Sequence, residues 1–304
     1  MLLLPLVTHF HARFAAWHRT LAKPLLLTSA ARPSTFEVDA IDEKGATVPT
    51  AIAGEHPLTL YLDRRELVTL MTLGAAPEAL ALGYLRNQRI VTGIERIAAV
   101  QVDWETASVA VTTRDGDFWD DAAAEARLAK RTVTTGCGQG TVFGDLMESI
   151  DEIRLPDSVR MTQEVLYSVM ERVRRHESIY KQAGAVHGCA LCSNEGAARG
   201  EIIYFVEDVG RHNAVDAIAG RMWLDGIDGG DKIFYTTGRL TSEMVIKCAQ
   251  MGIPILLSRS GLTQMGHEIA RRVGITMIGR CQGRHYLLFT GQQRFVSAPG
   301  TLVA

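Results

Sequence analysis

Residues 134–141 read TTGCGQGT, which sets one thiol, that of Cys137, among glycines and threonines. Buried structural cysteines usually stand in apolar runs and behave as small hydrophobic residues, whereas the first apolar residue after Cys137 is Val142. Glycines on both sides permit unusual backbone torsions and let another molecule come close to the chain. The pattern indicates either an exposed, reactive thiol or an ordinary flexible loop that happens to hold a cysteine.

Arginines follow the ends of several segments that have the pattern of strands. They are Arg211 after EIIYFVE, Arg239 after KIFYTT, Arg259 after IPILLS and Arg280 after ITMIG. Ligands of open α/β sheets bind beyond the carboxyl ends of the strands, and guanidinium groups pair with phosphate through two hydrogen bonds. Each arginine alone could be an ordinary solvated residue beside a turn. Their recurrence in a chain of net charge −2 favours a site for phosphate or pyrophosphate.

Other titratable residues give weaker signals. His212 could donate to a phosphate or act as a general acid, although a single histidine is more often structural. Cys189 and Cys192 have C-x-x-C spacing, but a structural zinc site needs four ligands and no second pair is present, so we predict no metal. Glu207 and Asp208 are neighbours in a strand pattern and should point to opposite faces, which argues against a cooperating carboxylate pair.

Two patterns divide the elements that must position these residues. Residues 36–113 alternate in the manner of strands around one helical segment, 77–87, which predicts an antiparallel sheet with a helix. From residue 159 onward, short apolar strands alternate with helices, one of them capped by Asn213, which predicts a layered α/β domain with a largely parallel sheet. We therefore expect four regions: a loose extension (1–35), a smaller α+β domain (36–131), a glycine/cysteine loop and linker (132–158) and an α/β cofactor-binding domain (159–304).

Composition narrows the classes of function. The 304 residues are 47% hydrophobic and 22% charged, which is typical of a globular protein. The nearly neutral charge gives no reason to expect nucleic acid or an anionic membrane as a partner. Five scattered cysteines suit a reducing cytoplasm better than a disulfide scaffold. No run approaches the roughly 20 apolar residues that span a bilayer.

Several ordered motifs resemble one family, the formate dehydrogenase accessory sulfurtransferases (the FdhD/NarQ family). EDVGRHNAVD (207–216) is similar to its signature, and TTGRLTSEMVIKCAQMGIPILLSRSG (236–261) to a second segment. LVTLMTLGAAPEALALGYLRNQRIV (67–91) resembles its N-terminal segment, and GCG (136–138) and GAVHG (184–188) stand in the expected order. The resemblance covers about residues 36–291, and a chance match across so many ordered blocks is remote.

The resemblance implies a function and a fold. Members take sulfur from a cysteine desulfurase and carry it as a persulfide on a loop cysteine. They pass it to the molybdenum bis-guanine-dinucleotide cofactor before that cofactor enters the catalytic subunit of formate dehydrogenase. Cys137 would then be the catalytic carrier, and GDP a ligand analogue. The resemblance further implies a homodimer and a C-terminal three-layer α/β domain similar to cytidine deaminases, beside a smaller α+β domain. The cofactor site would comprise Arg280, Cys281, Gln282, Gly283, Arg284 and His285, together with Arg211, His212 and Arg239 of the strand ends.

The sequence also departs from the family pattern. Many members have a second loop cysteine, but here Cys137-Gly138-Gln139-Gly140 lacks it. A single thiol can hold a persulfide, although it cannot release the sulfur by forming a disulfide within the loop. The alternative is therefore a non-catalytic chaperone that only binds the molybdenum cofactor. A zinc hydrolase would need H-x-E and P-C-x-x-C motifs, and neither occurs.

Overall fold

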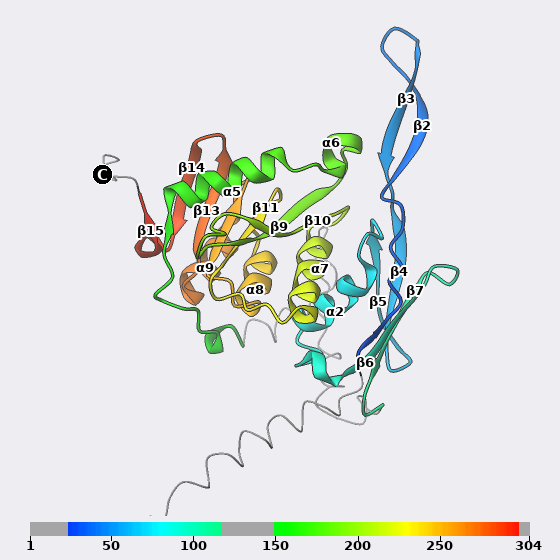
Figure 1. Ribbon diagram of the computed structural model, residues 1–304, viewed down its shortest axis with the longest axis horizontal. Coiled ribbons are helices and arrows are strands. Elements are labelled where there is room, and N and C mark those ends of the chain that lie inside the picture. The colour runs from blue at the N-terminus through cyan, green and yellow to red at the C-terminus, as the bar shows by residue number, and fades with distance from the viewer. Residues whose placement is uncertain (1–23, 117–148, 298–304) are drawn as a thin grey trace, which may run out of the picture.

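The computed structural model describes residues 24–116 and 149–297, which form two packed halves (Figure 1). Cys137 and the loop around it lie outside the described residues, as does the polar segment 120–131, whose composition predicts a helix. The mixed α/β class expected from the sequence is confirmed, while the likeness to cytidine deaminases stays a prediction. Among the described residues, no helix has the length and apolar character needed to cross a membrane.

The N-terminal half is built on a five-stranded sheet packed against one helix, α2 (Pro77–Asn87). In spatial order the strands are β1 (Leu26–Leu27), β6 (Ile97–Asp103), β7 (Ser108–Thr113), β4 (His56–Leu62) and β5 (Arg65–Thr72). The prediction of an antiparallel sheet is wrong in part, because β4 pairs with β7, and β1 with β6, in parallel. The crossover through α2 between β5 and β6 brings β7 back alongside β4 in the same direction.

Two further strands form a separate hairpin that projects beyond this sheet (Figure 1). They are β2 (Thr35–Ile41) and β3 (Thr47–Ala53), and they pair antiparallel along their whole length. The chain before the hairpin, residues 24–34, falls within the stretch expected to be loose, yet it is held to the sheet. Ala30 N donates to Glu78 Oε1 at 2.7 Å, and Trp104 Nε1 donates to Ala30 O at 2.6 Å.

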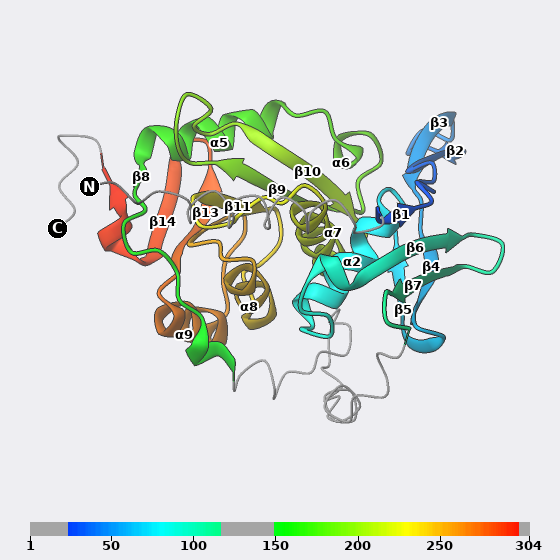
Figure 2. The same ribbon diagram turned by 60° about the horizontal axis from the view of Figure 1, so that its bottom comes forward.

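The C-terminal half is a six-stranded sheet between two layers of helices (Figure 2). Its strands in spatial order are β10 (Ile202–Asp208), β9 (His187–Ser193), β11 (Lys232–Thr236), β12 (Ile255–Ser258), β13 (Thr276–Gln282) and β14 (His285–Thr290). Only β11–β12 and β12–β13 pair in parallel, so the prediction of a largely parallel sheet is wrong. The hairpin β9–β10 and the returning strand β14 supply the antiparallel pairs, since short turns can only reverse a strand.

The helical layers follow from the alternation of side chains along the strands. Phe234 and Leu256 pack toward one face, which is covered by α7 (Arg211–Leu224), α8 (Ser242–Gln250) and α9 (Gln264–Val273). Tyr235 and Leu257 pack toward the other face, which is covered by α5 (Gln163–Arg175) and the short α6 (Ile179–Ala183). The three-layer arrangement expected from the sequence is therefore present (Figure 1).

Helix α7 begins earlier than its sequence pattern predicted. Its N-cap is Gly210 rather than Asn213, which lies inside the first turn. The Asn213 side chain instead donates to Asp208 Oδ1 at 2.8 Å and to the Met71 carbonyl at 2.6 Å. The residue therefore fastens α7 to the end of β5 in the other half of the chain.

The two halves meet where α2 crosses α7, side by side in both views (Figures 1 and 2). Glycines let the two backbones touch. A Cβ atom at Gly83 would lie 1.6 Å from the Asp216 carbonyl oxygen, and one at Gly220 would lie 1.9 Å from that of Ala79. No side chain fits at either position, so the crossing depends on both glycines.

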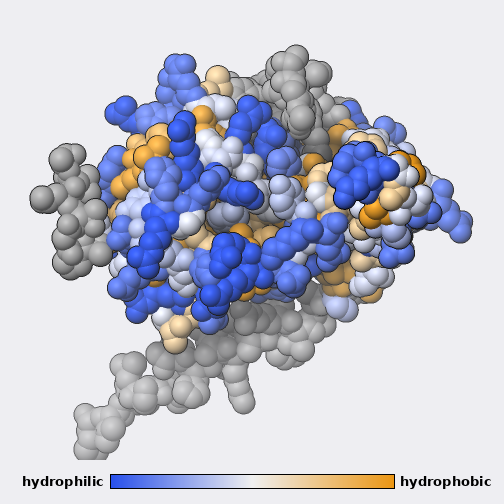
Figure 3. All heavy atoms as spheres, turned by 90° about the horizontal axis from the view of Figure 1, so that it is seen from above, coloured by the Kyte–Doolittle hydropathy of each residue, from blue (hydrophilic) through white to orange (hydrophobic). Residues whose placement is uncertain are grey.

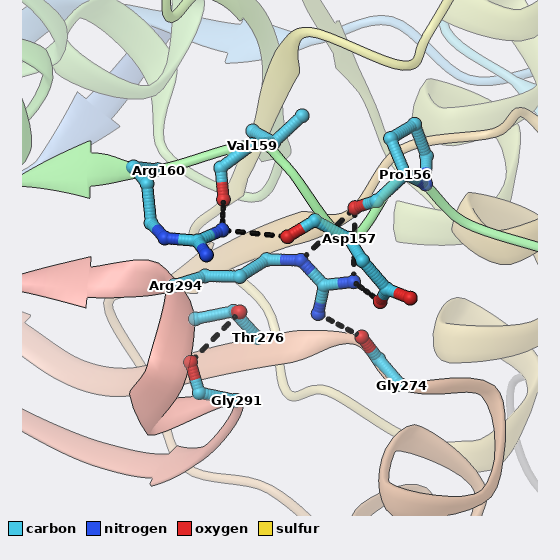
Figure 4. A network of polar contacts seen from close by, with 8 residues as sticks. All are labelled: Pro156, Asp157, Val159, Arg160, Gly274, Thr276, Gly291 and Arg294. Atoms are coloured by element: carbon cyan, nitrogen blue, oxygen red, sulfur yellow. Dashed lines mark hydrogen bonds and ion pairs between the residues drawn. The ribbon is translucent and has the colours of Figure 1, made fainter.

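A buried arginine closes the C-terminal half (Figure 4). Arg294, whose side chain is 1% exposed, donates Nε to the Pro156 carbonyl at 3.2 Å and Nη2 to the same oxygen at 3.0 Å. Nη2 also reaches Asp157 Oδ1 at 3.1 Å, and Nη1 donates to the Gly274 carbonyl. One side chain thus holds the linker before α5 against the turn between α9 and β13.

Short strands and an ion pair reinforce this closure. β15 (Phe295–Val296) pairs in parallel with β8 (Met161–Thr162). Where the described chain resumes at residue 149, Arg272 on α9 binds both carboxylate oxygens of Asp151. The linker is therefore fixed to the C-terminal half at several points before it enters α5.

Candidate functional site

A cavity of about 690 Å³ lies at the edge of the sheet where β10, β11, β12 and β13 end and β9 begins. It is the place where ligands of open α/β sheets bind. Every one of these strands contributes to the wall, through Glu207, Gly188, Thr237, Arg259 and Cys281, while α5 and α6 close the opposite side. A volume of several hundred Å³ is typical of sites for nucleotide-sized ligands.

The cavity combines aromatic walls with cationic side chains. Its rings are those of Tyr167, Tyr180, Phe205 and Tyr235. Its cations are Arg174, Lys181, Arg259 and Arg284, against the two acidic residues Glu171 and Glu207. The Arg284 guanidinium stacks over the Tyr167 ring, 5.7 Å from the centroid. Flat rings beside guanidinium groups suit a planar base attached to phosphates.

Both acidic residues of the cavity have partners of their own. Glu171 binds Arg174 at 2.8 Å, and this hydrogen bond is the main reason why its pKa falls to about 2. Glu207 accepts from the backbone N–H groups of Ile179 and Tyr180, at 2.6 and 3.1 Å, and so holds the first turn of α6. Arg174 therefore offsets the charge of Glu171. Lys181, Arg259 and Arg284 then outnumber Glu207 in the charge felt by a ligand.

Glu207 and Asp208 point to different sides of β10, as their spacing predicted. While Glu207 holds α6, Asp208 accepts from Thr72 Oγ1 at 2.5 Å and from Leu73 N at 3.1 Å, in the N-terminal half. Burial raises the Asp208 pKa, although its hydrogen bonds oppose the shift. The two carboxylates thus do separate structural work rather than acting together.

Four of the expected cofactor residues line the cavity: Cys281, Gln282, Gly283 and Arg284. They form the end of β13 and the tight turn into β14, where Gly283 has φ of 61°, a value that favours glycine. The turn carries the Arg284 side chain to the mouth of the cavity. His285, the next residue, is exposed and does not line it.

The other expected residues lie around the cavity rather than in its wall. Arg239 and Arg280 are exposed. Arg211 packs under the turn at Gly238, so that a Cβ atom added to this glycine would lie 3.0 Å from Arg211 Cδ. His212 is buried on the α8 side of the sheet, with Nε2 3.2 Å from Glu243 Oε2. Their part in cofactor binding stays a prediction.

Sequence reasoning missed the side chains that α5 and the neighbouring strands supply. Tyr167 and Arg174 stand on α5, while Phe205 and Tyr235 come from β10 and β11. The apolar spacing of residues 163–175 indicates only the face of the helix that packs on the core. Two signals were available in the sequence. One is the aromatic residues on the strands. The other is a tyrosine at the margin of a narrow apolar helix face, because its hydroxyl group needs a hydrogen-bond partner.

The four cysteines that the structure describes are buried thiols. Cys189, Cys192, Cys248 and Cys281 are at most 4% exposed. Burial raises the pKa of Cys189, Cys192 and Cys281 to about 12, and that of Cys248 also rises well above its usual value. The thiolate is the reactive form of cysteine, so these thiols are inert near neutral pH. Within the described residues, no group of three or more potential ligands could hold a metal ion.

Comparison with known proteins agrees with the motifs. A family model described as the FdhD/NarQ family matches residues 53–296. The sequence is 32% identical over 249 residues to "Sulfur carrier protein FdhD" of Listeria monocytogenes serotype 4b, which covers 81% of this chain and 92% of that protein. The protein of the same name from Listeria innocua is 31% identical over 270 residues, covering 88% of this chain and 98% of the relative.

A solved structure shares the fold. It is the crystal structure of a protein described as a formate dehydrogenase accessory protein from Desulfotalea psychrophila. It matches with a TM-score of 0.67 and 25% sequence identity, over 87% of this chain and all of that one. The resemblance drawn from the motifs is therefore confirmed.

Proposed function

Because this chain belongs to the FdhD/NarQ family, we propose that it is a sulfur carrier that serves the maturation of formate dehydrogenase. We further propose that Cys137 holds the sulfur as a persulfide and delivers it to the molybdenum bis-guanine-dinucleotide cofactor. The donor is a cysteine desulfurase and the recipient is the formate dehydrogenase catalytic subunit. The protein works as a homodimer in the cytoplasm.

The burial of the other thiols is the observation that supports Cys137 most directly. A carrier must present a thiolate to two partners in turn. Cys189, Cys192, Cys248 and Cys281 are buried, and their raised pKa values keep them protonated near neutral pH. This leaves Cys137, in its glycine-rich segment, as the candidate among the five cysteines of the chain.

Sulfur transfer through one thiol needs no change in the oxidation state of the protein over a cycle. The Cys137 thiolate attacks the terminal sulfur of the donor persulfide, and the electron pair of the broken S–S bond stays on the donor cysteine. In the second step the acceptor attacks the terminal sulfur on Cys137, and the electron pair returns to Sγ. The second step removes the need for a resolving thiol within the loop.

The cavity supports a nucleotide-bearing acceptor. The molybdenum cofactor, here the substrate, carries guanine and pyrophosphate groups. Tyr167, Phe205 and Tyr235 offer aromatic surfaces to a base, while Arg259 and Arg284 offer guanidinium groups to phosphates. GDP is therefore the analogue that should occupy the cavity.

Mass spectrometry after incubation with a cysteine desulfurase and free cysteine tests the carrier. We expect the wild-type chain to gain the mass of one sulfur atom on a peptide that contains Cys137, and Cys137→Ala to gain none. Cys281→Ala is the matched control, because it removes the cavity thiol and should still be loaded. Loading of Cys137→Ala would exclude the carrier role of this residue.

The absence of a second loop cysteine favours one other function. A chaperone that binds the molybdenum cofactor without carrying sulfur would need only the cavity. It predicts that GDP binds normally while Cys137 is never loaded by the desulfurase. It also predicts that Cys137→Ala fully supports formate dehydrogenase, whereas the carrier function predicts loss of formate dehydrogenase activity.

A further inference from the structure

The β2–β3 hairpin carries apolar side chains that stay partly exposed, although α6 contacts β3 and the His56 ring contacts Phe36. Its register sets Phe36 opposite Ile52, and Ala40 opposite Val48, so that these residues and Val38 share one side. Phe36, Val38, Val48 and Ile52, the apolar hairpin face, are each between 38 and 46% exposed. Figure 3, which looks onto the hairpin at the right, shows hydrophobic side chains beside its hydrophilic tip.

The contact with α6 leaves the apolar hairpin face partly exposed, so the hairpin still needs a cover. Two strands without further support are marginally stable in water. Within residues 24–116 and 149–297, no third strand pairs with β2 or β3. A large exposed apolar surface on a globular protein usually marks a contact with another segment or molecule.

The charges of the hairpin indicate what its cover should carry. Between Thr35 and Ala53 the acidic residues are Glu37, Asp39, Asp42 and Glu43, and Lys44 is the only cation. Glu37 and Asp39 flank the apolar hairpin face from the other side of β2, while Asp42 and Glu43 lie in the tip. A complementary cover is apolar and carries several cations but few acids.

A second copy of the hairpin fits these charges poorly. An antiparallel pairing of β2 with β2 of another copy that overlaps most of the strand and keeps the apolar residues on one side opposes Glu37 to Asp39, or one of them to its own copy. Like charges directly opposite each other destabilise a sheet. The edge of β3 contains Pro49, which has no N–H group to donate.

We propose that residues 1–23 of the same chain cover the apolar hairpin face. This segment contains Arg13, Arg19 and Lys23 and no acidic residue. Its larger apolar residues are Leu2, Leu3, Leu4, Leu6, Val7, Phe10, Phe14, Trp17 and Leu21. It is therefore both apolar and cationic, the complement of the hairpin.

The connection between the two segments favours this contact over one with a free partner. Residues 24–34 join them and are anchored to the N-terminal sheet through β1 and Ala30. A short tether gives the segment an effective concentration on the order of millimolar at the hairpin. Both the segment and β2 precede residues 53–296, so the contact is a feature outside the part that matches the family.

Hydrogen–deuterium exchange of the β2 and β3 amides tests the proposal. In the full-length chain, the combined substitutions Arg13→Glu and Arg19→Glu should speed the exchange of these amides at least tenfold. A chain that begins at residue 24 should show the same change, and a synthetic peptide of residues 1–23 should restore the slow exchange. The control combines Arg199→Glu and Arg271→Glu, which reverse two exposed cations elsewhere and should leave the hairpin unchanged.

Two results would overturn the proposal. One is equal exchange of the hairpin in the wild-type chain, the charge-reversed chain and the shortened chain. The other is exchange that slows with rising protein concentration whether or not residues 1–23 are present, which would assign the cover to a second copy. Loading of Cys137 with sulfur is measured separately, so either failure leaves the proposed function standing.

Discussion

Asn87 on α2 and Asp216 on α7 join the two halves of the chain by a hydrogen bond of 2.7 Å in the interior. The other Asp216 oxygen accepts from Lys247 Nζ, also at 2.7 Å, and Lys247 lies 3.6 Å from Glu243. Burial opposes the charge of Lys247, but Asp216 and Glu243 outweigh burial and raise its pKa. The N-terminal half thus supplies a neutral partner to a charged pair that belongs to the C-terminal half.

We predict that Asp216→Asn strongly destabilises the protein. It removes the main counter-ion of Lys247, whose side chain is fully buried. Breaking a buried ion pair from one side typically costs about 3–5 kcal/mol. Urea unfolding followed by circular dichroism measures the change. Asp231→Asn is the control, because it breaks a partly exposed pair with Lys232 and should change stability by less than about 1 kcal/mol.

Gly83→Ala and Gly220→Ala should each lower the free energy of unfolding by at least about 3 kcal/mol, at the upper end of the cost of overpacking. In an ordinary helix the same change stabilises by about 1 kcal/mol. The difference arises because each new Cβ would meet a carbonyl oxygen of the facing helix at less than 2 Å. Gly261→Ala, where nothing lies within 4 Å, is the control. Wild-type stability of both helix variants would contradict the close crossing.

The cavity predicts which arginines contact a nucleotide. Calorimetry with GDP should show that Arg284→Ala and Arg259→Ala each lose about 1.5–3 kcal/mol of binding free energy, the usual worth of a charge-assisted hydrogen bond. Arg280→Ala should bind nearly as well as the wild type, because its exposed side chain does not line the cavity. An equal loss for Arg280→Ala would extend the site beyond the cavity, as the sequence motifs had implied.

The buried thiols predict sensitivity to alkali. A cysteine titrates near pH 8.5 when unfolded, whereas Cys189, Cys192 and Cys281 have pKa values of about 12 in the folded chain. Between these values the folded state holds more protons than the unfolded state. The contribution of these thiols to the free energy of unfolding is therefore fully present below pH 8.5. It is lost as the pH rises toward 12. Urea midpoints at pH 8 and 10 measure the loss.

A labelling experiment checks the same burial without unfolding the protein. At pH 7.5, iodoacetamide should leave Cys189, Cys192, Cys248 and Cys281 unmodified in the folded chain and modify all of them in urea. Cys281 is the most informative, since it lines the cavity and is nevertheless only 4% exposed. Rapid modification of Cys281 would make it a second candidate for the sulfur carrier.

Local signals in the sequence predicted the elements well. Helix α2 runs from Pro77 to Asn87 as expected, because proline suits the first turn and the apolar spacing continues to the end. The strand-end rule also located the cavity, since it depends only on strand direction. Pairing between strands that lie far apart in the sequence could not be predicted from it. The parallel contact of β4 with β7 and the separation of the β2–β3 hairpin depend on tertiary packing, which alternation along one strand does not encode.

The partners of charged residues could not be predicted from the sequence either. Lys247 and Arg294 read as ordinary cations in the sequence, yet both are buried and hold segments together. His212 lies beside Glu243, a partner that the sequence did not indicate. Tyr167 gave no signal in the sequence, because a helical pattern shows which face is apolar and not what lies opposite it. Side chains that act across long sequence distances therefore needed the structure.

The clamp made by Arg294 and the pairing of β15 with β8 has a consequence for synthesis on the ribosome. The residues that fasten the linker at Pro156 and Asp157 are translated after all the residues that line the cavity. While they remain in the exit tunnel, the N-terminal half can already pack, because domains fold as they emerge. The C-terminal half cannot complete its packing until Arg294 and β15 have emerged. The half that holds the cavity is thus closed only after β15 has emerged, and shorter nascent chains lack this closure.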